Sequence, residues 1–363
     1  MEIRISTLEE IDERSWNKRV ASDANATTRQ TTIDARRTKD YIRAKPYFLQ
    51  AFEGTEVVAQ LVFYKCFIYW APLLVNPLLF KAVLPLLQWH FQMYFWYFGP
   101  LVFEQDRRAL ILSEILRAIE EQAHRDKVMS INAIPCIAMK DHPLQETVER
   151  AFEEWAYEKE DVGTISLALD KTEDELWGDL DSRLRRKVNR ARRDGVEVEE
   201  VHKREELAEY ACLLKETYQR NGLVERPNRW LDLFFDHYRG TDYVRLYLAR
   251  LNGRPLAGQL IEQLNGNAYL AGVSVADEAL QNSIPANELL QWEIIRRCRQ
   301  EEMQFIDWGG YVLKPQNAKD EGINKFKKKW GGEVYAYHRY SKILRHGQFK
   351  LIQKLRDRVV ARR

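Results

Sequence analysis

The sequence lacks the patterns that mark several large functional classes. Its four cysteines are scattered, with no C-x-x-C pair and no nearby histidines, so a zinc site and a disulfide framework are both excluded. The seven histidines also lack metal-ligand spacing, and we therefore expect no metal. No nucleophile elbow is present. These absences disfavour a covalent mechanism and a metallohydrolase, and direct attack in a ternary complex fits better.

Charge of one sign does not dominate the chain either. The 56 Lys and Arg nearly balance the 54 Asp and Glu, which excludes a uniformly basic nucleic-acid coat but leaves room for local clusters. Met1–Glu10 is mixed and acidic, unlike a cleavable signal. Together with the scattered cysteines, this start indicates a cytoplasmic protein.

One segment has no charged residue at all. Ala82–Phe103 runs for 22 residues without Asp, Glu, Lys or Arg, which is long enough to span a bilayer. It also divides into a helical piece, Leu78–Phe91, and an aromatic strand, Met93–Phe103, and its polar and helix-breaking residues count against a span. Three interpretations stay open: a buried helix plus core strand, a helix on a membrane surface, and a true span. In the second case residues 78–103 are a peripheral membrane contact at the inner face of the cell membrane.

The length of 363 residues suits two domains. We place the first at residues 1–158, the second at 159–345 and a basic C-terminal helix at 346–363. The first domain is predicted to hold strand Glu2–Ser6, helix Leu8–Ala21, strands Pro46–Phe52 and Val57–Phe67 around a Gly-containing turn, strand Met93–Val102, helix Arg107–Asp126 and strand Val128–Ile134. This order is an α/β layer pattern.

The second domain is predicted to repeat that order. Its expected helices are Thr172–Arg193, closed by Gly195, then Arg204–Asn221, Asn228–Tyr238 and Ala286–Glu301, with a final helix at Gln348–Arg363. Its expected strands are Asp161–Leu169, Tyr243–Leu251, Leu256–Gln263, Asn267–Val275, Met303–Trp308 and Val334–Arg339. The turn Asn252-Gly253-Arg254-Pro255 predicts a hairpin. The two halves therefore look like a duplicated fold.

Three segments together resemble the Fem-type (FemABX-like) aminoacyltransferases and their GNAT-like relatives. They are the basic helix Arg185–Arg193 running into Gly195-Val196, the strand and turn Phe305-Ile306-Asp307-Trp308-Gly309-Gly310, and the segment Gly322–Gly332 with its Phe326-Lys327 pair. The resemblance covers residues 160–340 well and the first domain only by layout. The chain has no sustained heptads between Leu176 and Tyr243, so it resembles the compact members without a coiled-coil arm.

The resemblance implies an α/β fold of two tandem GNAT-like domains, with mixed, mostly antiparallel sheets flanked by helices and a groove between the domains. It also implies a non-ribosomal peptidyltransferase reaction. An aminoacyl-tRNA would donate its amino acid to an amine of a nucleotide- or lipid-linked peptidoglycan precursor, without a bound cofactor.

The reaction centre is expected in the lysine-rich Lys325–Lys329 segment. By resemblance, Lys327 would stabilise the oxyanion or the terminal phosphates of the donor, and Phe326 would shape the acceptor-end pocket. A solvated basic turn before a strand is the plain alternative. Asp307, at the end of a strand, would orient or deprotonate the attacking amine, or simply cap the following turn.

Other charged and aromatic residues are candidates for binding. Seven of the eleven residues from Arg183 to Arg193 are basic, so the helix appears basic nearly all round and suits a polyanion such as tRNA. Packing of arginine stems over the core is the alternative. The expected polyanion contacts are Arg185, Arg186, Lys187, Arg190, Arg193, Lys328 and Lys329. By resemblance the precursor diphosphate would meet Arg36, Arg37, Lys39, Arg220 and Arg226, with Tyr269 and Tyr311 in the groove.

Two other functions compete with this one. An acyl-CoA-dependent N-acyltransferase acting on a sugar or small-molecule amine needs a Gly-rich loop that lets backbone N–H groups approach the pyrophosphate. The equivalent Gln281–Ala286 segment offers Ile284 and Pro285 instead, which lowers that hypothesis. A non-catalytic, membrane-associated scaffold is the other alternative.

Overall fold

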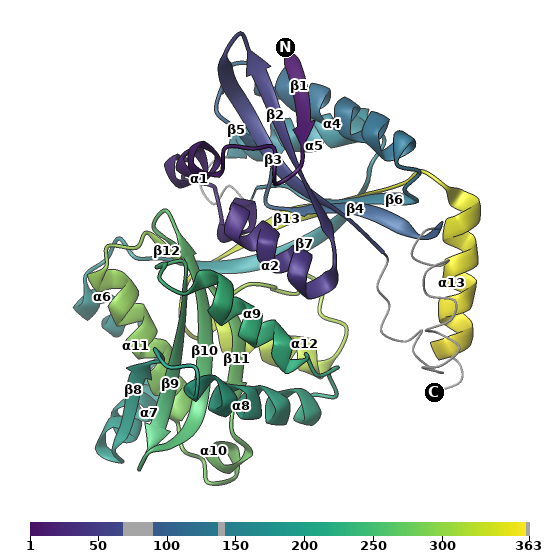
Figure 1. Ribbon diagram of the computed structural model, residues 1–363. Coiled ribbons are helices and arrows are strands. Elements are labelled where there is room, and N and C mark those ends of the chain that lie inside the picture. Colours follow the sequence, from purple (N-terminus) through teal and green to yellow (C-terminus); the bar gives the residue numbers. More distant parts are fainter. Residues whose placement is uncertain (68–89, 137–141, 361–363) are drawn as a thin grey trace. The chain divides into compact units, whose positions relative to one another are not determined.

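A computed structural model describes residues 1–67, 90–136 and 142–360. The chain divides into two compact units (Figure 1). Unit 1 comprises Met1–Asp161 and His338–Arg363, and unit 2 comprises Val162–Tyr337. The first boundary thus lies three residues beyond the one expected. Residues 338–345, which the sequence analysis placed in the second domain, group with unit 1, as does the C-terminal helix.

Unit 1 is a sheet with helices on both faces. Its elements before the crossing into unit 2 are β1 (Glu2–Ser6), α1 (Glu13–Ser22), η1 (Thr28–Gln30), α2 (Thr32–Ile42), β2 (Lys45–Glu53), β3 (Glu56–Phe67), β4 (Gln92–Tyr97), β5 (Leu101–Val102), α4 (Arg108–Arg125), β6 (Ser130–Ile134), α5 (His142–Glu154) and the start of β7 (Glu158–Ala168). The chain returns to unit 1 with the end of β13 (Glu333–Ile343) and with α13 (His346–Val360).

Successive side chains of β2 point to opposite faces of the sheet, which explains how apolar residues of one strand are buried on both faces. Leu49 packs with Ile115 of α4 in the main core, whereas Phe48 meets the ring of Trp16 in α1, edge to face at 4.9 Å. The side chains of these four residues are all fully buried. Apolar residues on both faces of one strand therefore fix α1 and α4 on opposite sides of the sheet.

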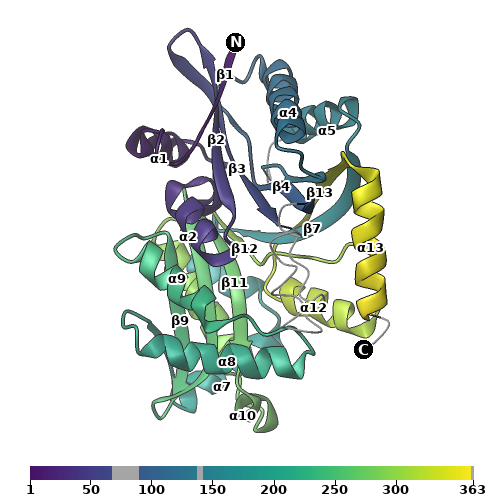
Figure 2. The ribbon, with the colours of Figure 1, turned by 45° about the vertical axis from the view of Figure 1, so that its right-hand side comes forward.

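Unit 2 repeats the design. Its elements are the rest of β7, α6 (Glu173–Asp179), α7 (Ser182–Arg193), β8 (Val196–Glu200), α8 (Glu206–Arg220), α9 (Asn228–Tyr238), β9 (Val244–Leu251), β10 (Arg254–Leu264), β11 (Asn267–Val275), α10 (Asp277–Gln281), α11 (Ala286–Gln300), β12 (Phe305–Asp307), α12 (Ala318–Lys328) and the start of β13. Helices α7 and α11 cover one face of the sheet and α8 and α9 the other (Figures 1 and 2).

The strand pairing is the same in both units. Unit 1 runs β1-β2-β3-β4-β6-β13 and unit 2 runs β8-β9-β10-β11-β12-β7, each with three antiparallel pairs, one parallel pair and a final antiparallel pair. The last strand of each sheet follows, in the chain, a helix of the other unit. β7 follows α5 of unit 1 but pairs with β12, and β13 follows α12 of unit 2 but pairs with β6. The expected mixed, mostly antiparallel sheets and the duplication of the fold are thus confirmed.

Local sequence explains the hairpins in unit 2. Asn252-Gly253 joins β9 to β10 and Asn265-Gly266 joins β10 to β11, and all four residues have positive φ angles between 49° and 77°. Two-residue Asn-Gly turns of this kind match the twist of antiparallel strands. The central strand β10 is therefore fixed at both ends by its own neighbouring residues.

Some predicted elements were wrong or missed. The single helix predicted over Thr172–Arg193 is two helices, because Asp181 accepts hydrogen bonds from the backbone of Arg183 and Leu184 and so begins α7 afresh. The first helix begins at Glu13, behind the cap of Asp12. Helices α2, α5, α10 and α12 were not predicted. The Lys325–Lys329 segment is consequently the end of α12 rather than a turn.

The uncharged stretch is only partly described. Residues 78–89 of the predicted helical piece lie outside the described residues. The strand that follows it is present as β4 and β5, with Trp96 fully buried in the core, so the prediction of a core strand is confirmed. Among the described residues, none of the helices has the length and apolar character that crossing a bilayer requires.

Candidate functional site

Asp307 is a buried carboxylate at the end of β12. Its Oδ1 atom accepts the Gly309 backbone N–H at 2.5 Å and the hydroxyl of Thr164 from β7. Only 5% of the residue is exposed. Burial raises the pKa of this carboxyl to about 6, against the opposing hydrogen bonds and the charge of Lys327. Asp307 therefore caps the following turn and at the same time keeps an unusual pKa near neutrality.

Lys327 reaches the same turn from the last turn of α12. Its Nζ atom donates to the carbonyl of Gly309 at 2.7 Å and to that of Gly310 at 2.5 Å. Burial lowers the pKa of the ammonium group, and the charge of Asp307 opposes that shift. An ammonium group has three N–H donors, so two carbonyls leave one donor for another acceptor. The structure thus brings Lys327 and Asp307, two of the predicted site residues, together around Gly309.

Two features hold α12 in this position. Asn324, buried, donates to the Val312 carbonyl at 2.8 Å and accepts the Val312 N–H at 3.0 Å. After the helix, Gly332 has a φ of +92°, and a β-carbon there would lie 2.6 Å from the Ser166 carbonyl oxygen. Only glycine allows the chain to pass so close to β7 with that backbone angle.

Phe326, the other half of the predicted pair, faces a different neighbour. Its ring lies 4.3 Å from the Nζ of Lys329, a distance typical of a cation–π contact. Lys328 is exposed, with its Nζ 5.3 Å from the ring of Tyr311. Tyr311 itself pairs with Gly163 through an isolated bridge. Phe326 and Tyr311 therefore lie beside the two lysines that follow Lys327.

Strand register adds residues that the sequence did not reveal. Tyr269 of β11 is the pairing partner of both Glu262 in β10 and Asp307 in β12, and Asp307 is paired with Ser166 in β7. Directly paired residues project from the same side of a sheet, which places this polar row on the α8/α9 face. Glu262 and Ser166 are buried. In the described part of the chain, no group lies within hydrogen-bond distance of the buried Ser166 hydroxyl.

The basic helix α7 is not basic all round, which corrects the sequence analysis. Leu184, Val188 and Ala191 are buried, at the i, i+4 and i+7 spacing that forms one helix face. The cations therefore occupy the remaining surface. Arg186 and Arg193 are exposed, and among the described residues no ion pair involves either. These two point away from the core, and Arg190 lies near them with its guanidinium donating to the Ser283 carbonyl.

Glu288 of α11 joins α7 to the end of α12. Its carboxylate accepts from Lys187 at 2.9 Å and from Lys329 at 3.3 Å. Burial alone would raise the pKa of Glu288, but the two lysine charges lower it overall. Burial lowers the pKa of Lys329. Glu288 is another residue that the sequence analysis missed, since nothing local marks a glutamate that bonds to two distant lysines.

The remaining α7 candidate is Arg185, which donates to the Gly178 carbonyl of the preceding helix, α6, at 3.2 Å. Arg220 of α8 is held by Asp277 and by the Val275 carbonyl, the latter at 3.1 Å. Arg226 lies over the ring of Trp230 at 4.5 Å. All three lie in unit 2 together with Tyr269 and Tyr311.

The first-domain cations differ in exposure. Arg36 and Lys39 are exposed on α2 and pair with Glu13 and Glu9. Arg37 is only 4% exposed and makes two hydrogen bonds to Oδ1 of Asp34, at 2.9 and 2.7 Å. The aspartate therefore fixes the Arg37 guanidinium within unit 1.

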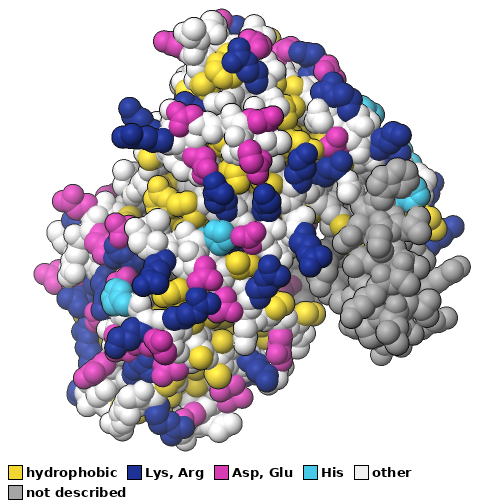
Figure 3. Space-filling view, in the orientation of Figure 1, with side chains coloured by type: hydrophobic (Ala, Val, Ile, Leu, Met, Phe, Trp, Pro, Cys, Tyr) yellow, Lys and Arg dark blue, Asp and Glu magenta, His cyan; other side chains and the backbone are white. Residues whose placement is uncertain are grey.

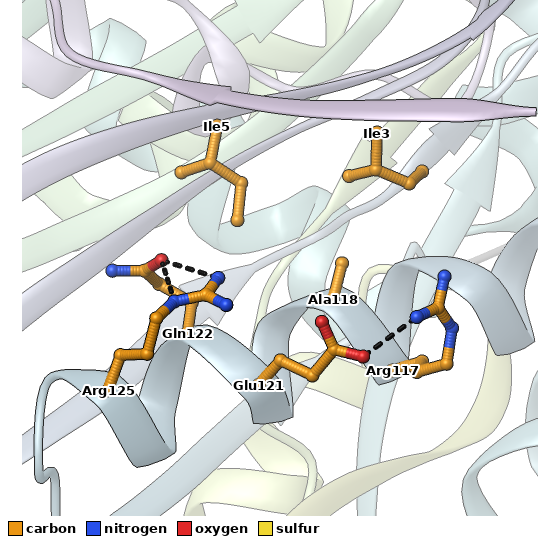
Figure 4. Close-up of a pocket in the computed structure, with 7 residues that line it drawn as sticks. All are labelled: Ile3, Ile5, Arg117, Ala118, Glu121, Gln122 and Arg125. Carbon is orange, nitrogen blue, oxygen red and sulfur yellow. Dashed lines mark hydrogen bonds and ion pairs between the residues drawn. The ribbon is translucent and has the colours of Figure 1, made fainter.

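Two hollows in unit 1 hold none of the candidate residues. The one in Figure 4, about 320 Å³, lies between β1 and α4, where Arg125 bonds to Gln122 and Arg117 to Glu121. The other, about 410 Å³, contains Cys136, and burial raises the pKa of that thiol, which makes it a poor nucleophile. In residues 1–67, 90–136 and 142–360, no His, Cys, Asp and Glu cluster forms a metal site.

The comparisons agree with this fold. Residues 179–328 match the family described as an acetyltransferase (GNAT) domain. A 126-residue stretch is 31% identical to the Lipid II:glycine glycyltransferase of two Staphylococcus epidermidis strains, covering 35% of this chain and only 30% of theirs. The crystal structure of FemX superposes with a TM-score of 0.75 at 16% identity, over 97% of this chain and 100% of FemX.

A tandem GNAT protein from the clavulanic acid pathway also has the same fold. It gives a TM-score of 0.53 at 14% identity, over 94% of this chain and 98% of its own. The predicted resemblance is therefore confirmed at two levels: the sequence match lies in part of the chain, and the fold match extends over nearly all of it.

Proposed function

We propose that this chain, which has a GNAT-like fold and a partial sequence match to Lipid II:glycine glycyltransferases, is an aminoacyltransferase that moves an amino acid from aminoacyl-tRNA to an amine of a peptidoglycan precursor. The observation that carries this proposal is the Lys327 ammonium group, held by two carbonyls with one N–H donor left over. The relatives with partial sequence identity are lipid II glycyltransferases, which supports a precursor of that class as acceptor.

The proposed reaction is a single displacement. The acceptor amine attacks the ester carbonyl carbon of the aminoacyl-tRNA, a C–N bond forms, and the C–O bond to the ribose breaks. The ribose oxygen leaves with the proton that the amine gives up. The carbonyl oxygen becomes anionic in the transition state, and the remaining Lys327 N–H would stabilise it. Asp307 acts as a positioning residue, since it fixes Gly309 through its N–H.

The surroundings of α11 support tRNA over acyl-CoA as donor. Pro285 has no N–H to offer a phosphate, and Pro285, Ala286 and Asn287 are buried at the start of the helix. The Ser283 carbonyl is already bonded to Arg190. In contrast, the outward arginines of α7, Arg186 and Arg193, are available to phosphates of a larger polyanion.

The acceptor is proposed to lie on the α8/α9 face of unit 2. The polar row Glu262, Tyr269 and Asp307 is on that face, and Arg220 is at the end of α8. Because charged tRNA is a cytoplasmic molecule, we place the reaction in the cytoplasm. We propose a peripheral contact with the membrane that holds a lipid-linked precursor, and within residues 78–103 the apolar sequence of residues 78–91 supports it.

The test is transfer of a radiolabelled amino acid from total charged tRNA to nucleotide-linked and lipid-linked precursors. We expect transfer by the parent protein and a loss of about 10² to 10³-fold in Lys327→Ala. Lys325→Ala is the matched control, because Lys325 is exposed on the same helix turn. Failure of the parent protein to transfer any amino acid to either precursor would overturn the proposal.

Two further measurements address the alternatives. Tight binding of an acyl-CoA thioester in calorimetry would indicate an N-acyltransferase instead. Normal cellular function of a Lys327→Ala, Asp307→Asn double variant would indicate a non-catalytic scaffold. The proposed function predicts neither result.

A further inference from the structure

The C-terminal helix α13 presents an outer face that nothing in the described chain covers. Its inner face is packed: Ile352 is fully buried with Phe91 and Met129, and Phe349 lies against the same cluster. The backbone N–H of Leu344 donates to the Met129 carbonyl at 2.9 Å and so fixes the approach to the helix. Figure 2 shows α13 as a separate helix at the edge of unit 1.

The outer face combines cations with an exposed apolar side chain. Lys350 and Lys354, one turn apart, are exposed, and 52% of Leu351 between them is accessible. Among the described residues, neither lysine has a hydrogen-bond or ion-pair partner. The sequence from residue 350 to 363 contains a single acidic residue, Asp357, and the six basic residues Lys350, Lys354, Arg356, Arg358, Arg362 and Arg363.

Two residues packed beneath α13, Phe67 and Phe91, flank a strongly apolar stretch of sequence. Residues 68–89 contain one charged residue, Lys81. The described chain stops at Phe67 and resumes at His90, and Phe67 and Phe91 belong to the cluster beneath α13. The inner face of α13 therefore packs against residues on both sides of this apolar stretch of sequence.

We propose that the outer face of α13 docks on an anionic phospholipid surface. Lysines flanking a leucine suit the boundary of a bilayer, where the cations meet anionic headgroups and the apolar side chain enters the boundary with the acyl chains. An RNA backbone would satisfy the lysines but would leave the exposed side chain of Leu351 in water. The lipid surface is therefore the occupant that accounts for both kinds of residue.

This docking surface is independent of the proposed transfer chemistry. None of its residues lies in the candidate reaction centre, which is in unit 2. Membrane binding and aminoacyl transfer can consequently fail separately. The variants used to test it change residues of α13 alone.

The experiment is co-sedimentation of the full chain with vesicles of equal parts phosphatidylglycerol and phosphatidylcholine, and with pure phosphatidylcholine vesicles. We expect salt-sensitive binding to the anionic vesicles only. Lys350→Gln with Lys354→Gln should weaken that binding by about tenfold or more, and Leu351→Gln should also weaken it. Arg14→Gln with Lys18→Gln is the matched control, because it removes two exposed cations at the same spacing from α1 of unit 1.

The control should bind like the parent protein, and thermal melting of every variant should show intact folding. The proposal is overturned if the parent protein stays in the supernatant with anionic vesicles. It is also overturned if the α13 variants and the parent bind alike. Loss of binding to a total tRNA preparation in the α13 variants, with vesicle binding unchanged, would assign the face to RNA and overturn the proposal as well.

Discussion

Asp307 and Lys327 hold the same glycine from its two backbone ends. The carboxylate accepts the N–H of Gly309, and the ammonium group donates to its carbonyl. Two opposite charges thus act on the two successive peptide groups that flank the α-carbon of Gly309, and among the described residues they form no direct ion pair. Protonation of Asp307 should therefore change the electrostatic environment of the Lys327 ammonium group. Through this buried carboxylate, the pH should also affect the geometry of the turn at Gly309.

The stability of the protein should report the ionisation of Asp307. The folded-state pKa of about 6 is above the ordinary value of 3.8, so the contribution of this group is fully present below pH 3.8 and is lost as pH rises through 6. The two pKa values are 3.8 and about 6, and each pKa unit corresponds to roughly 1.4 kcal/mol, so the free energy of unfolding should fall by about 3 kcal/mol. The Asp307→Asn variant cannot ionise at this position. Its free energy of unfolding, relative to that of the parent protein, should therefore rise by this amount between pH 4 and 7.

The measurement is the free energy of unfolding of both proteins by urea at several pH values. Thr164→Val removes a hydrogen bond that lowers the pKa of Asp307, so its pKa should rise further and the pH window should move upward. A parent-to-Asn difference that stays constant from pH 4 to 7 would contradict the argument.

Gly332→Ala should be strongly destabilising, because an alanine would combine an unfavourable φ of +92° with a contact of 2.6 Å to the Ser166 carbonyl. Gly331→Ala is the matched control, since its φ is +86° but its nearest contact is the flexible Leu167 side chain at 3.5 Å. The control should lose about 1–3 kcal/mol from the backbone angle alone, and Gly332→Ala clearly more. Thermal melting compares them, and equal losses would rule out the close approach to β7.

Asn324→Ala should reduce transfer activity as well as stability. It leaves the N–H and carbonyl of Val312 without their partner, at a cost of about 1–3 kcal/mol, and frees α12 to move. Asn317→Ala removes the N-cap of the same helix, at about 1 kcal/mol, but leaves the Val312 contacts intact. Turnover measured well below both melting temperatures separates the two effects. Equal activities of the two variants would show that Asn324 does not position Lys327.

Arg186→Ala with Arg193→Ala should weaken tRNA binding and its salt dependence. If each arginine meets one phosphate, the slope of log K against log salt should fall by about 1.5 in magnitude. Arg254→Ala is the control, because Arg254 is exposed elsewhere in unit 2. Filter binding over a range of salt concentrations gives the slopes. An unchanged slope in the double variant would remove α7 from the proposed donor site.

The sequence predicted those parts of the fold that nearby residues determine. The Asn252-Gly253 turn and the strands beside it follow from two-residue hairpin chemistry, and α9 begins and ends where the apolar pattern predicts. Helix α12 was missed because Gly322 and four lysines obscure its apolar face, although Asn317 and Asp320 form a recognisable N-terminus. The break at Asp181 likewise has a local signal, an aspartate before Ser182.

The site was predictable only in part, because it depends on pairs that are far apart in the chain. Lys327 and Asp307 were identified from local motifs and resemblance. Thr164 lies 143 residues before Asp307, and no local pattern shows that its hydroxyl reaches that carboxylate. Tyr269 was proposed for the groove, but its pairing with Glu262 and Asp307 follows from strand register, which single-sequence patterns do not specify.

The exchange of β7 and β13 has a consequence for how the protein is made. Strand β6 gains its second neighbour from Tyr340–Ile343, which are synthesised after all of unit 2 up to Tyr337. Until β13 has been made, unit 1 therefore carries an open sheet edge, which is a template for wrong pairing and for aggregation. A chain truncated before β13 should accumulate with unit 1 unfinished, although nearly all of the strands and helices of that unit would already be present.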